Sequence, residues 1–209
     1  MLTPELMLAG YAKGIFPMAE SRDDDALHWV DPRLRGILPL DGFHMSRSLR
    51  RRILREPHEI RVDATFSEIV AACAARAETW INTPLMQLYD MLHARGHAHS
   101  LGVWQDGTLT GGVFGVTLGR AFFGESMFSI RSDASKIALA YLVDRLRAAE
   151  IALFDTQFVT PHLASLGAVE ISRADYHSLL AEALEGTASF TSPKTPSPQL
   201  LVQRSTQMS

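Results

Sequence analysis

Three apolar runs in the middle of the chain decide its fold: HSLGVW (residues 99–104), LTGGVFGV (109–116) and AFFGESMF (121–128). Asp106-Gly107 separates the first two runs, and Gly119-Arg120 separates the last two. An Asp-Gly pair between extended runs is a strong signal for a β-hairpin. The three runs therefore predict an antiparallel, three-stranded meander at the centre of the fold.

The segments on either side of the meander predict helices and one more buried strand. Thr3-Pro4 can begin a helix because it places a hydroxyl at the N-cap and a proline at the first helical position. Residues 151–158 form an apolar run typical of a buried strand, and Asp133 is expected to cap the helix before it. Helical spacing covers residues 3–14, 46–55, 66–76, 84–94, 134–149 and 173–184. This order predicts an α+β fold with a mixed, mostly antiparallel sheet and flanking helices.

Composition limits the classes of function. The chain has 209 residues, 46% of them hydrophobic, which is enough for a sizeable core. Its net charge of −3 means that a nucleic-acid-binding surface has to be a local patch. The single cysteine, Cys73, excludes an intramolecular disulfide, and no long apolar run or signal peptide is evident. We expect a cytosolic protein.

Polar side chains occur inside apolar segments at three positions: Glu125, Asp155 and Gln157. Burial of ionisable groups is costly and is frequent at functional sites. On a strand, residues 155 and 157 point to the same face, so we expect their side chains to lie side by side. The alternative is that Asp155 and Gln157 end the strand before His162, and that Glu125 is a surface residue at a strand end. Spacing alone leaves both open.

Two further clusters have a functional and a structural interpretation. Residues 46–55 predict a basic helix with four arginines on one face: Arg47, Arg50, Arg51 and Arg55. Such a face either is simply solvated or binds nucleic-acid phosphates. His93, His97 and His99 lie close in sequence, but no carboxylate follows at a convincing ligand spacing. Hydrogen-bonded core histidines are therefore expected there, rather than a metal site.

Several motifs together resemble one family. GYAKGIFP (10–17), GESMFS (124–129), DASK (133–136) and FDTQ (154–157) are similar to segments of the leucyl/phenylalanyl-tRNA–protein transferases, and the resemblance extends to about Tyr176. It implies an acetyltransferase-like (GNAT) fold, with a small N-terminal subdomain over residues 1–31 and a catalytic domain over 32–186. Residues 187–209 are rich in Ser, Thr, Pro and Gln, so a disordered tail is expected there.

The resemblance also implies an activity. Members of this family move Leu or Phe from aminoacyl-tRNA to the α-amine of proteins with N-terminal Arg or Lys, which marks them for degradation. The implied reaction needs no cofactor and no metal. Asp155 and Gln157 would be the catalytic pair, in which Gln157 contacts the attacking amine or the ester and Asp155 orients and polarises it. Glu125 would bind an ammonium group.

The same resemblance assigns the remaining binding residues. Trp80 would stack on the terminal adenosine of the tRNA. The arginine face of residues 46–55 would contact tRNA phosphates. The donated side chain would enter an apolar pocket formed by Tyr89, Phe122, Met127 and Phe154.

Two other functions fit parts of the chain. A coenzyme A-dependent acyltransferase on the same fold would need a glycine-rich pyrophosphate loop at a helix N-terminus. Residues 129–134 occupy that place, but they contain no glycine, and Asp133 would repel phosphate. An RNA-binding module could use the arginine helix alone. It would leave the buried Glu125, Asp155 and Gln157 without a purpose.

Overall fold

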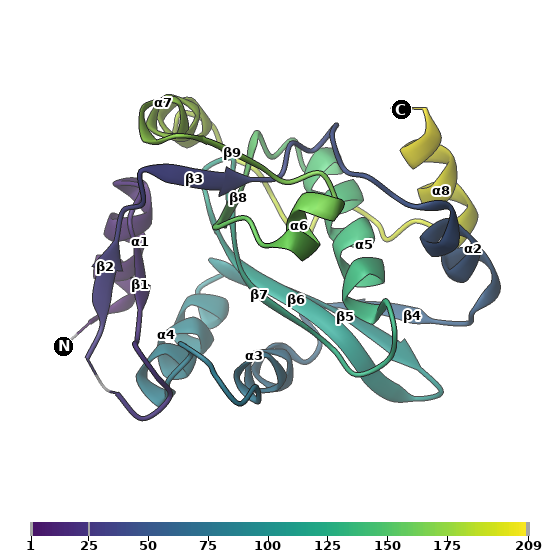
Figure 1. Ribbon diagram of the computed structural model, residues 1–209, viewed down its shortest axis with the longest axis horizontal. Coiled ribbons are helices and arrows are strands. Elements are labelled where there is room, and N and C mark those ends of the chain that lie inside the picture. The colour runs from purple at the N-terminus through teal and green to yellow at the C-terminus, as the bar shows by residue number, and fades with distance from the viewer. Residues whose placement is uncertain (1, 25, 208–209) are drawn as a thin grey trace.

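A seven-stranded sheet runs through the protein, as seen in a computed structural model that describes residues 2–24 and 26–207 (Figure 1). Its strand order is β4-β5-β6-β7-β8-β3-β9, and every neighbouring pair is antiparallel except β7 and β8. The strands are β3 (Leu34–Ile37), β4 (Glu59–Val62), β5 (Ala98–Gln105), β6 (Thr108–Leu118), β7 (Ala121–Ser129), β8 (Leu153–Gln157) and β9 (Val169–Ser172). The predicted α+β class with a mostly antiparallel sheet is confirmed.

Helices cover both faces of this sheet (Figure 1). Phe123 of β7 points into a core that it shares with α1, α3, α4 and α7, whereas the adjacent Phe122 points into the opposite core with α2, α5 and α8. Side chains alternate along a strand, so one strand supplies both cores. The helices are α1 (Pro4–Ala12), α2 (Arg47–Arg55), α3 (Phe66–Ala74), α4 (Thr83–Ala94), α5 (Ala134–Ala148), α6 (Pro161–Ser165), α7 (Arg173–Leu184) and α8 (Pro198–Thr206). A separate two-stranded sheet pairs β1 (Phe16–Met18) with β2 (His28–Val30).

The predicted meander is confirmed as β5, β6 and β7. Its last strand, β7, separates from the neighbouring β8 partway along its length. β7 and β8 pair in parallel only from Ala121–Leu153 to Phe123–Asp155. Beyond that pair β7 continues to Ser129 beside β6, and β8 continues to Gln157 beside β3, but the two strands no longer pair with each other. The ends of the two strands therefore present backbone and side chains to a space between them.

The prediction of a disordered tail is wrong. Phe190 is 3% exposed and stacks on His99 and Phe122, with ring centroids 4.4 Å and 5.7 Å away. Further along, α8 buries Leu201 against the core that contains α5. The polar composition hid these two apolar anchors, which act together with polar contacts such as the Arg204–Asp144 ion pair to hold the segment on the core.

Asp133 is at the N-cap of α5, as predicted, but its side chain does not cap the helix. Asp133 precedes the helix with a left-handed backbone (φ 64°) and makes no side-chain capping bond. Its carboxylate pairs instead with Arg52 and Lys136. None of the described helices is both long enough and apolar enough to span a membrane.

Candidate active site

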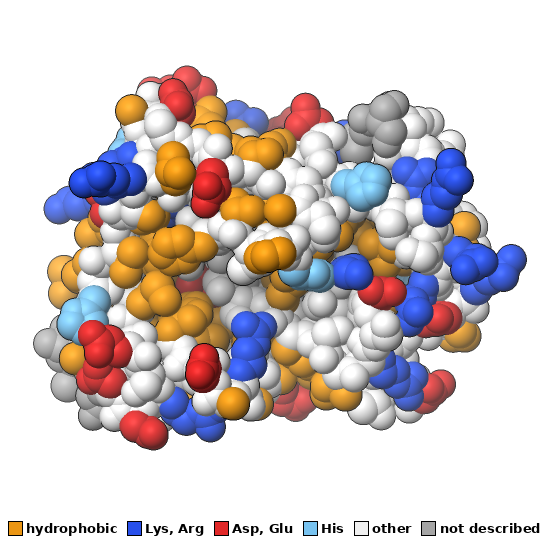
Figure 2. All heavy atoms as spheres, in the orientation of Figure 1, with side chains coloured by type: hydrophobic (Ala, Val, Ile, Leu, Met, Phe, Trp, Pro, Cys, Tyr) orange, Lys and Arg blue, Asp and Glu red, His pale blue; other side chains and the backbone are white. Residues whose placement is uncertain are grey.

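A cavity of about 600 Å³ lies where β7 and β8 part. In Figure 2, hydrophobic side chains gather left of the centre of this face, and Lys and Arg side chains stand out over α2 at the right. Backbone and side chains from the ends of α3, β7 and β8, from the start of α5 and from α6 line the cavity. Its lining includes Arg76, Trp80, Glu125, Ser126, Met127, Ser129, Ser135, Thr156, Gln157, Phe158 and His162.

Glu125 is the charged group at the floor of the cavity. Its carboxylate accepts hydrogen bonds from the Tyr11 hydroxyl (2.6 Å), the Tyr89 hydroxyl (2.7 Å) and the Gln157 amide (3.2 Å). Burial raises the pKa of Glu125 to about 7, although these three hydrogen bonds act to lower it. A carboxyl group with that pKa exchanges a proton at neutral pH, as general acids and bases do.

Asp155 lies behind the cavity wall rather than in it. The carboxylate is 0% exposed and binds the Arg35 guanidinium at two points (2.9 and 2.6 Å). It also accepts hydrogen bonds from the Tyr176 hydroxyl (2.8 Å) and the Gln157 backbone N–H (2.7 Å). The Arg35 guanidinium carbon lies 4.4 Å from the ring centroids of both Phe16 and Tyr176. These four hydrogen bonds occupy both oxygens of the carboxylate.

Gln157 ends β8 in the left-handed conformation (φ 64°), which is uncommon for a residue with a Cβ. The hydrogen bond from its N–H to Asp155 holds this turn, and the turn directs the amide to Glu125. The expected side-by-side arrangement of the two side chains is therefore wrong in its geometry. Asp155 holds the backbone of Gln157, and the amide of Gln157 lies in the cavity.

The four pocket residues expected from the sequence fall into two groups. Met127 and Phe154 line a smaller cavity of about 80 Å³ that shares lining residues with the larger one. Tyr89 is buried and binds Glu125. Phe122 is 1% exposed and packs edge-on against Phe154. The apolar lining of the smaller cavity also includes Val113, Leu139 and Leu163.

Trp80 lines the larger cavity. Arg76, which sequence reasoning missed, lines it too and donates a hydrogen bond to the Met127 carbonyl. Arg22 in turn donates to the carbonyls of Ala74 and Arg76, so the end of α3 is held in place. This wall therefore combines an aromatic surface with a cation.

The basic helix is α2, and it lies beside the cavity rather than in its wall. Arg47, Arg51 and Arg55 are exposed, whereas Arg50 is half-buried and its Nε has no hydrogen-bond partner among the described residues. Arg52, which was not singled out, points to the loop before α5. The exposed arginines belong to the group of Lys and Arg side chains over α2 in Figure 2, and Arg52 connects this helix to the loop before α5, whose Ser135 lines the cavity.

The three clustered histidines do not converge. His93 binds the Ala98 carbonyl (2.8 Å), His97 the Thr117 carbonyl (3.3 Å) and His99 the Asp63 carboxylate (2.8 Å). In the part of the chain that the structure describes, no group of three or more His, Cys, Asp or Glu side chains could hold a metal ion.

A cavity with a titratable carboxylate and an amide at its floor is typical of an enzyme active site, here on an α+β fold. The fold is similar to that of FemX, with a TM-score of 0.50 at 13% sequence identity, over 72% of this chain and 64% of the FemX chain. Two sequence models match: leucyl/phenylalanyl-tRNA protein transferase over residues 37–181, and its N-terminal domain over 1–33.

Full-length relatives agree with these matches. A leucyl/phenylalanyl-tRNA–protein transferase of Cereibacter sphaeroides is 65% identical over 209 residues, which is 100% of this chain and 98% of that protein. One of Roseobacter denitrificans is 63% identical over 208 residues, covering 100% and 99%. The chain belongs to the leucyl/phenylalanyl-tRNA–protein transferase family, as its motifs predicted.

Proposed function

We propose that this protein transfers Leu or Phe from an aminoacyl-tRNA to the α-amine of a protein acceptor. The observation that carries the proposal is the Glu125–Gln157 centre at the floor of a cavity, in a chain of this family. An aminoacyl ester is already activated. The enzyme therefore has to align amine and ester, remove a proton and stabilise the tetrahedral oxyanion.

Glu125 is the group best suited to remove the proton from the acceptor amine. An α-amine has a pKa near 8, so a fraction of the acceptor arrives as an ammonium ion. A carboxylate with a pKa of about 7 can bind that ammonium and accept a proton from it. The amide nitrogen of Gln157 faces Glu125, which leaves the amide oxygen free to accept a hydrogen bond from the attacking amine.

Asp155 is proposed as a positioning residue. Its carboxylate fixes the left-handed turn at Gln157 and is itself fixed by Arg35. A rigid support of this kind keeps the amide within the narrow range of geometry that transfer requires.

The donor is proposed to occupy both cavities. The apolar side chain of Leu or Phe would enter the smaller cavity beside Met127 and Phe154. The terminal adenosine would stack on Trp80, and the acceptor stem would continue toward α2. Tyr89 and Phe122 would support these walls from behind.

Further features follow from the same proposal. They are an acetyltransferase-like (GNAT) fold with an N-terminal subdomain over residues 1–31, a preference for N-terminal Arg or Lys, and a reaction without cofactor or metal. A cytosolic location and a role in protein degradation stay predictions from the sequence. The alternative, coenzyme A-dependent acyl transfer, gains no support from the family match.

The direct test uses tRNA charged with Leu or Phe and a peptide that begins with Arg. We expect the peptide to gain one Leu or Phe residue, measured by mass spectrometry. The same peptide with an acetylated N-terminus is the control and should gain nothing. Transfer from acetyl-coenzyme A instead of charged tRNA would contradict the proposal, as would no transfer from either tRNA.

A variant connects the activity to the cavity. Gln157→Ala removes the amide and should lower kcat/KM about 10²-fold, the size of effect seen when one transition-state hydrogen bond is lost. Gln87→Ala, the same substitution at an exposed position of α4 that does not line the cavity, is the matched control and should change kcat/KM far less. Equal losses in the two variants would mean that Gln157 has only a structural role.

A further inference from the structure

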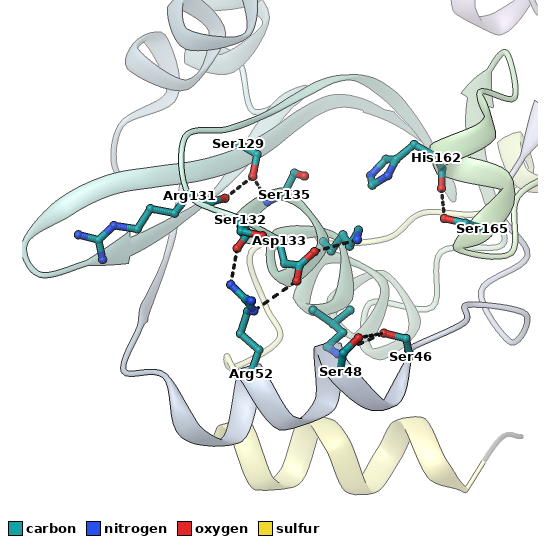
Figure 3. Close-up of polar contacts among 12 residues, drawn as sticks. Ser46, Ser48, Arg52, Ser129, Arg131, Ser132, Asp133, Ser135, His162 and Ser165 are labelled. Carbon is teal, nitrogen blue, oxygen red and sulfur yellow. Dashed lines mark hydrogen bonds and ion pairs between the residues drawn. The ribbon is translucent and has the colours of Figure 1, made fainter.

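One wall of the larger cavity has donor groups that the proposed chemistry does not use. It is formed by the start of α5 and by the turn into α6, where Ser135 and His162 line the cavity and Lys136 follows directly (Figure 3). The N–H groups of Ala134 and Ser135 are already bonded, to the Arg131 carbonyl and the Ser129 hydroxyl. Any ligand at this wall would therefore be bound by side chains.

Ser135 is the first indication of a ligand. The residue is only 9% exposed, yet its hydroxyl has no hydrogen-bond partner among the residues that the structure describes. Figure 3 shows its side chain on the side of the loop where His162 lies. A hydroxyl that faces the cavity without a partner from the protein can donate its proton to a ligand there.

Side-chain donors close to Ser135 could hold an anion. The Asp133 carboxylate is neutralised by two cations, Lys136 at 2.8 Å and Arg52 at 3.2 Å, and Arg52 is anchored on the Ser132 carbonyl (3.0 Å). Arg52 also pairs with Glu56 at 3.6 Å, so these four side chains sum to zero and the donors, not a net charge, would bind the ligand. The ammonium of Lys136 uses one of its three donors on Asp133, so two remain for a ligand.

His162 contributes a neutral donor from α6. Burial lowers the pKa of His162, and the nearby Lys136 lowers it further. The neutral ring still carries one N–H, and Figure 3 shows the ring pointing across the cavity toward the start of α5. A hydroxyl, an ammonium and a ring N–H together suit a tetrahedral, singly charged oxyanion.

We propose that Ser135, Lys136 and His162 form a binding site for a phosphodiester, namely the phosphate on the 5′ side of the terminal adenosine of the donor. This proposal rests on the proposed function. If the adenosine stacks on Trp80 and its aminoacyl group enters the smaller cavity, its 5′ side faces the wall that contains Ser135 and His162. The site would fix the 3′ end of any tRNA, because phosphate contacts carry no sequence information.

Two minimal donors test the site: phenylalanyl-adenosine and the same compound with a 5′-methylphosphate, which is a singly charged phosphodiester, each with a peptide acceptor beginning with Arg. In the wild type we expect the phosphate to raise kcat/KM about tenfold, since hydrogen bonds to a charged group are the stronger ones. In Ser135→Ala and in Lys136→Gln the ratio between the two donors should fall toward one. The ratio cancels any general effect of a substitution on folding or chemistry.

Ser132→Ala is the matched control, because it makes the same change in the same loop at an exposed side chain, and Arg52 contacts only the Ser132 backbone. It should keep the wild-type ratio. A wild-type ratio of one, or an unchanged ratio in both site variants, would overturn the phosphate site. Failure of the wild type with charged tRNA would instead overturn the proposed function.

Coenzyme A is the other ligand that could place a phosphate group at this wall, because it carries a pyrophosphate. We expect it not to inhibit transfer from the 5′-methylphosphate donor. Inhibition by coenzyme A that Ser135→Ala relieved would assign the wall to a coenzyme and overturn the proposal.

Discussion

At the residue scale, burial of Glu125 gives it a pKa suited to proton transfer but lowers the stability of the folded protein. Its pKa rises from 4.5 to about 7 on folding, so the folded protein binds more protons than the unfolded chain between these two pH values. Stability therefore falls as the pH rises through this window. Above pH 7, the raised pKa of Glu125 lowers the free energy of unfolding by about 3 kcal/mol.

This cost predicts the behaviour of Glu125→Gln. The variant removes the buried charge and should raise the free energy of unfolding by up to about 3 kcal/mol at pH 8, but hardly at pH 4.5. Urea denaturation at the two pH values measures the difference. The same variant should transfer poorly, because it cannot accept a proton. A variant no more stable than the wild type at pH 8 would contradict the raised pKa.

Asp155 has the opposite character, because its charge is paired. Asp155→Asn leaves the buried Arg35 guanidinium without a counter-charge and should lower the free energy of unfolding by about 3–5 kcal/mol. Glu59→Gln is the matched control. It breaks an equally bidentate ion pair, with Arg61, at an exposed residue of β4 and should lower the free energy of unfolding far less. Similar losses in the two variants would mean that burial does not strengthen the Arg35–Asp155 pair.

The sequence pointed to some members of this centre and not to others, for a physical reason. Glu125, Asp155 and Gln157 are conspicuous because a polar residue in an apolar run needs an explanation. Tyr11 was not predicted as a site residue, and Tyr89 was predicted only as an apolar pocket wall, because a tyrosine on the apolar face of a helix looks like ordinary core until its hydroxyl partner is known. The left-handed turn at residue 157 and the role of Arg35 depend on contacts between distant segments, which spacing does not encode.

At the scale of elements, turn residues and helical spacing predicted the hairpins and helices, because contacts close in sequence hold these elements together. The meander was predictable because each hairpin carries its own turn signal, and the helices because of their spacing. The tail was not, because its order depends on Phe190 packing against residues some 70 and 90 positions earlier in the chain. The carbonyl of Phe190 also accepts a hydrogen bond from Arg145 (2.8 Å).

The contacts of the tail predict the effect of Phe190→Ala. Removing a buried ring should lower the free energy of unfolding by about 3–5 kcal/mol. Thr191→Ala, the next residue and an exposed one, is the control and should stay within about 0.5 kcal/mol. Thermal or urea denaturation measures both. A Phe190 variant as stable as the wild type would mean that the tail contributes nothing to the core.

At the scale of the whole molecule, the charge is distributed unevenly. The net charge is −3, yet α2 carries an exposed arginine patch beside the cavity. Leu49 and Ile53, on the other side of α2, are each 1% exposed and hold the helix on the core. The arginines are thus free of a packing role, and a nucleic acid could be attracted locally by a protein that would repel it overall.

That separation makes the patch testable on its own. Replacing Arg47, Arg51 and Arg55 by Gln keeps helix propensity, so stability should barely change. Affinity for tRNA should fall, and the slope of log K against log salt should flatten by about 0.7–0.9 per lost phosphate contact. Arg61→Gln, whose guanidinium is already paired with Glu59, should leave the slope unchanged. Transfer from phenylalanyl-adenosine, which lacks the acceptor stem, should respond far less than transfer from tRNA. An unchanged salt slope in the triple variant would show that the patch is only a solvated face.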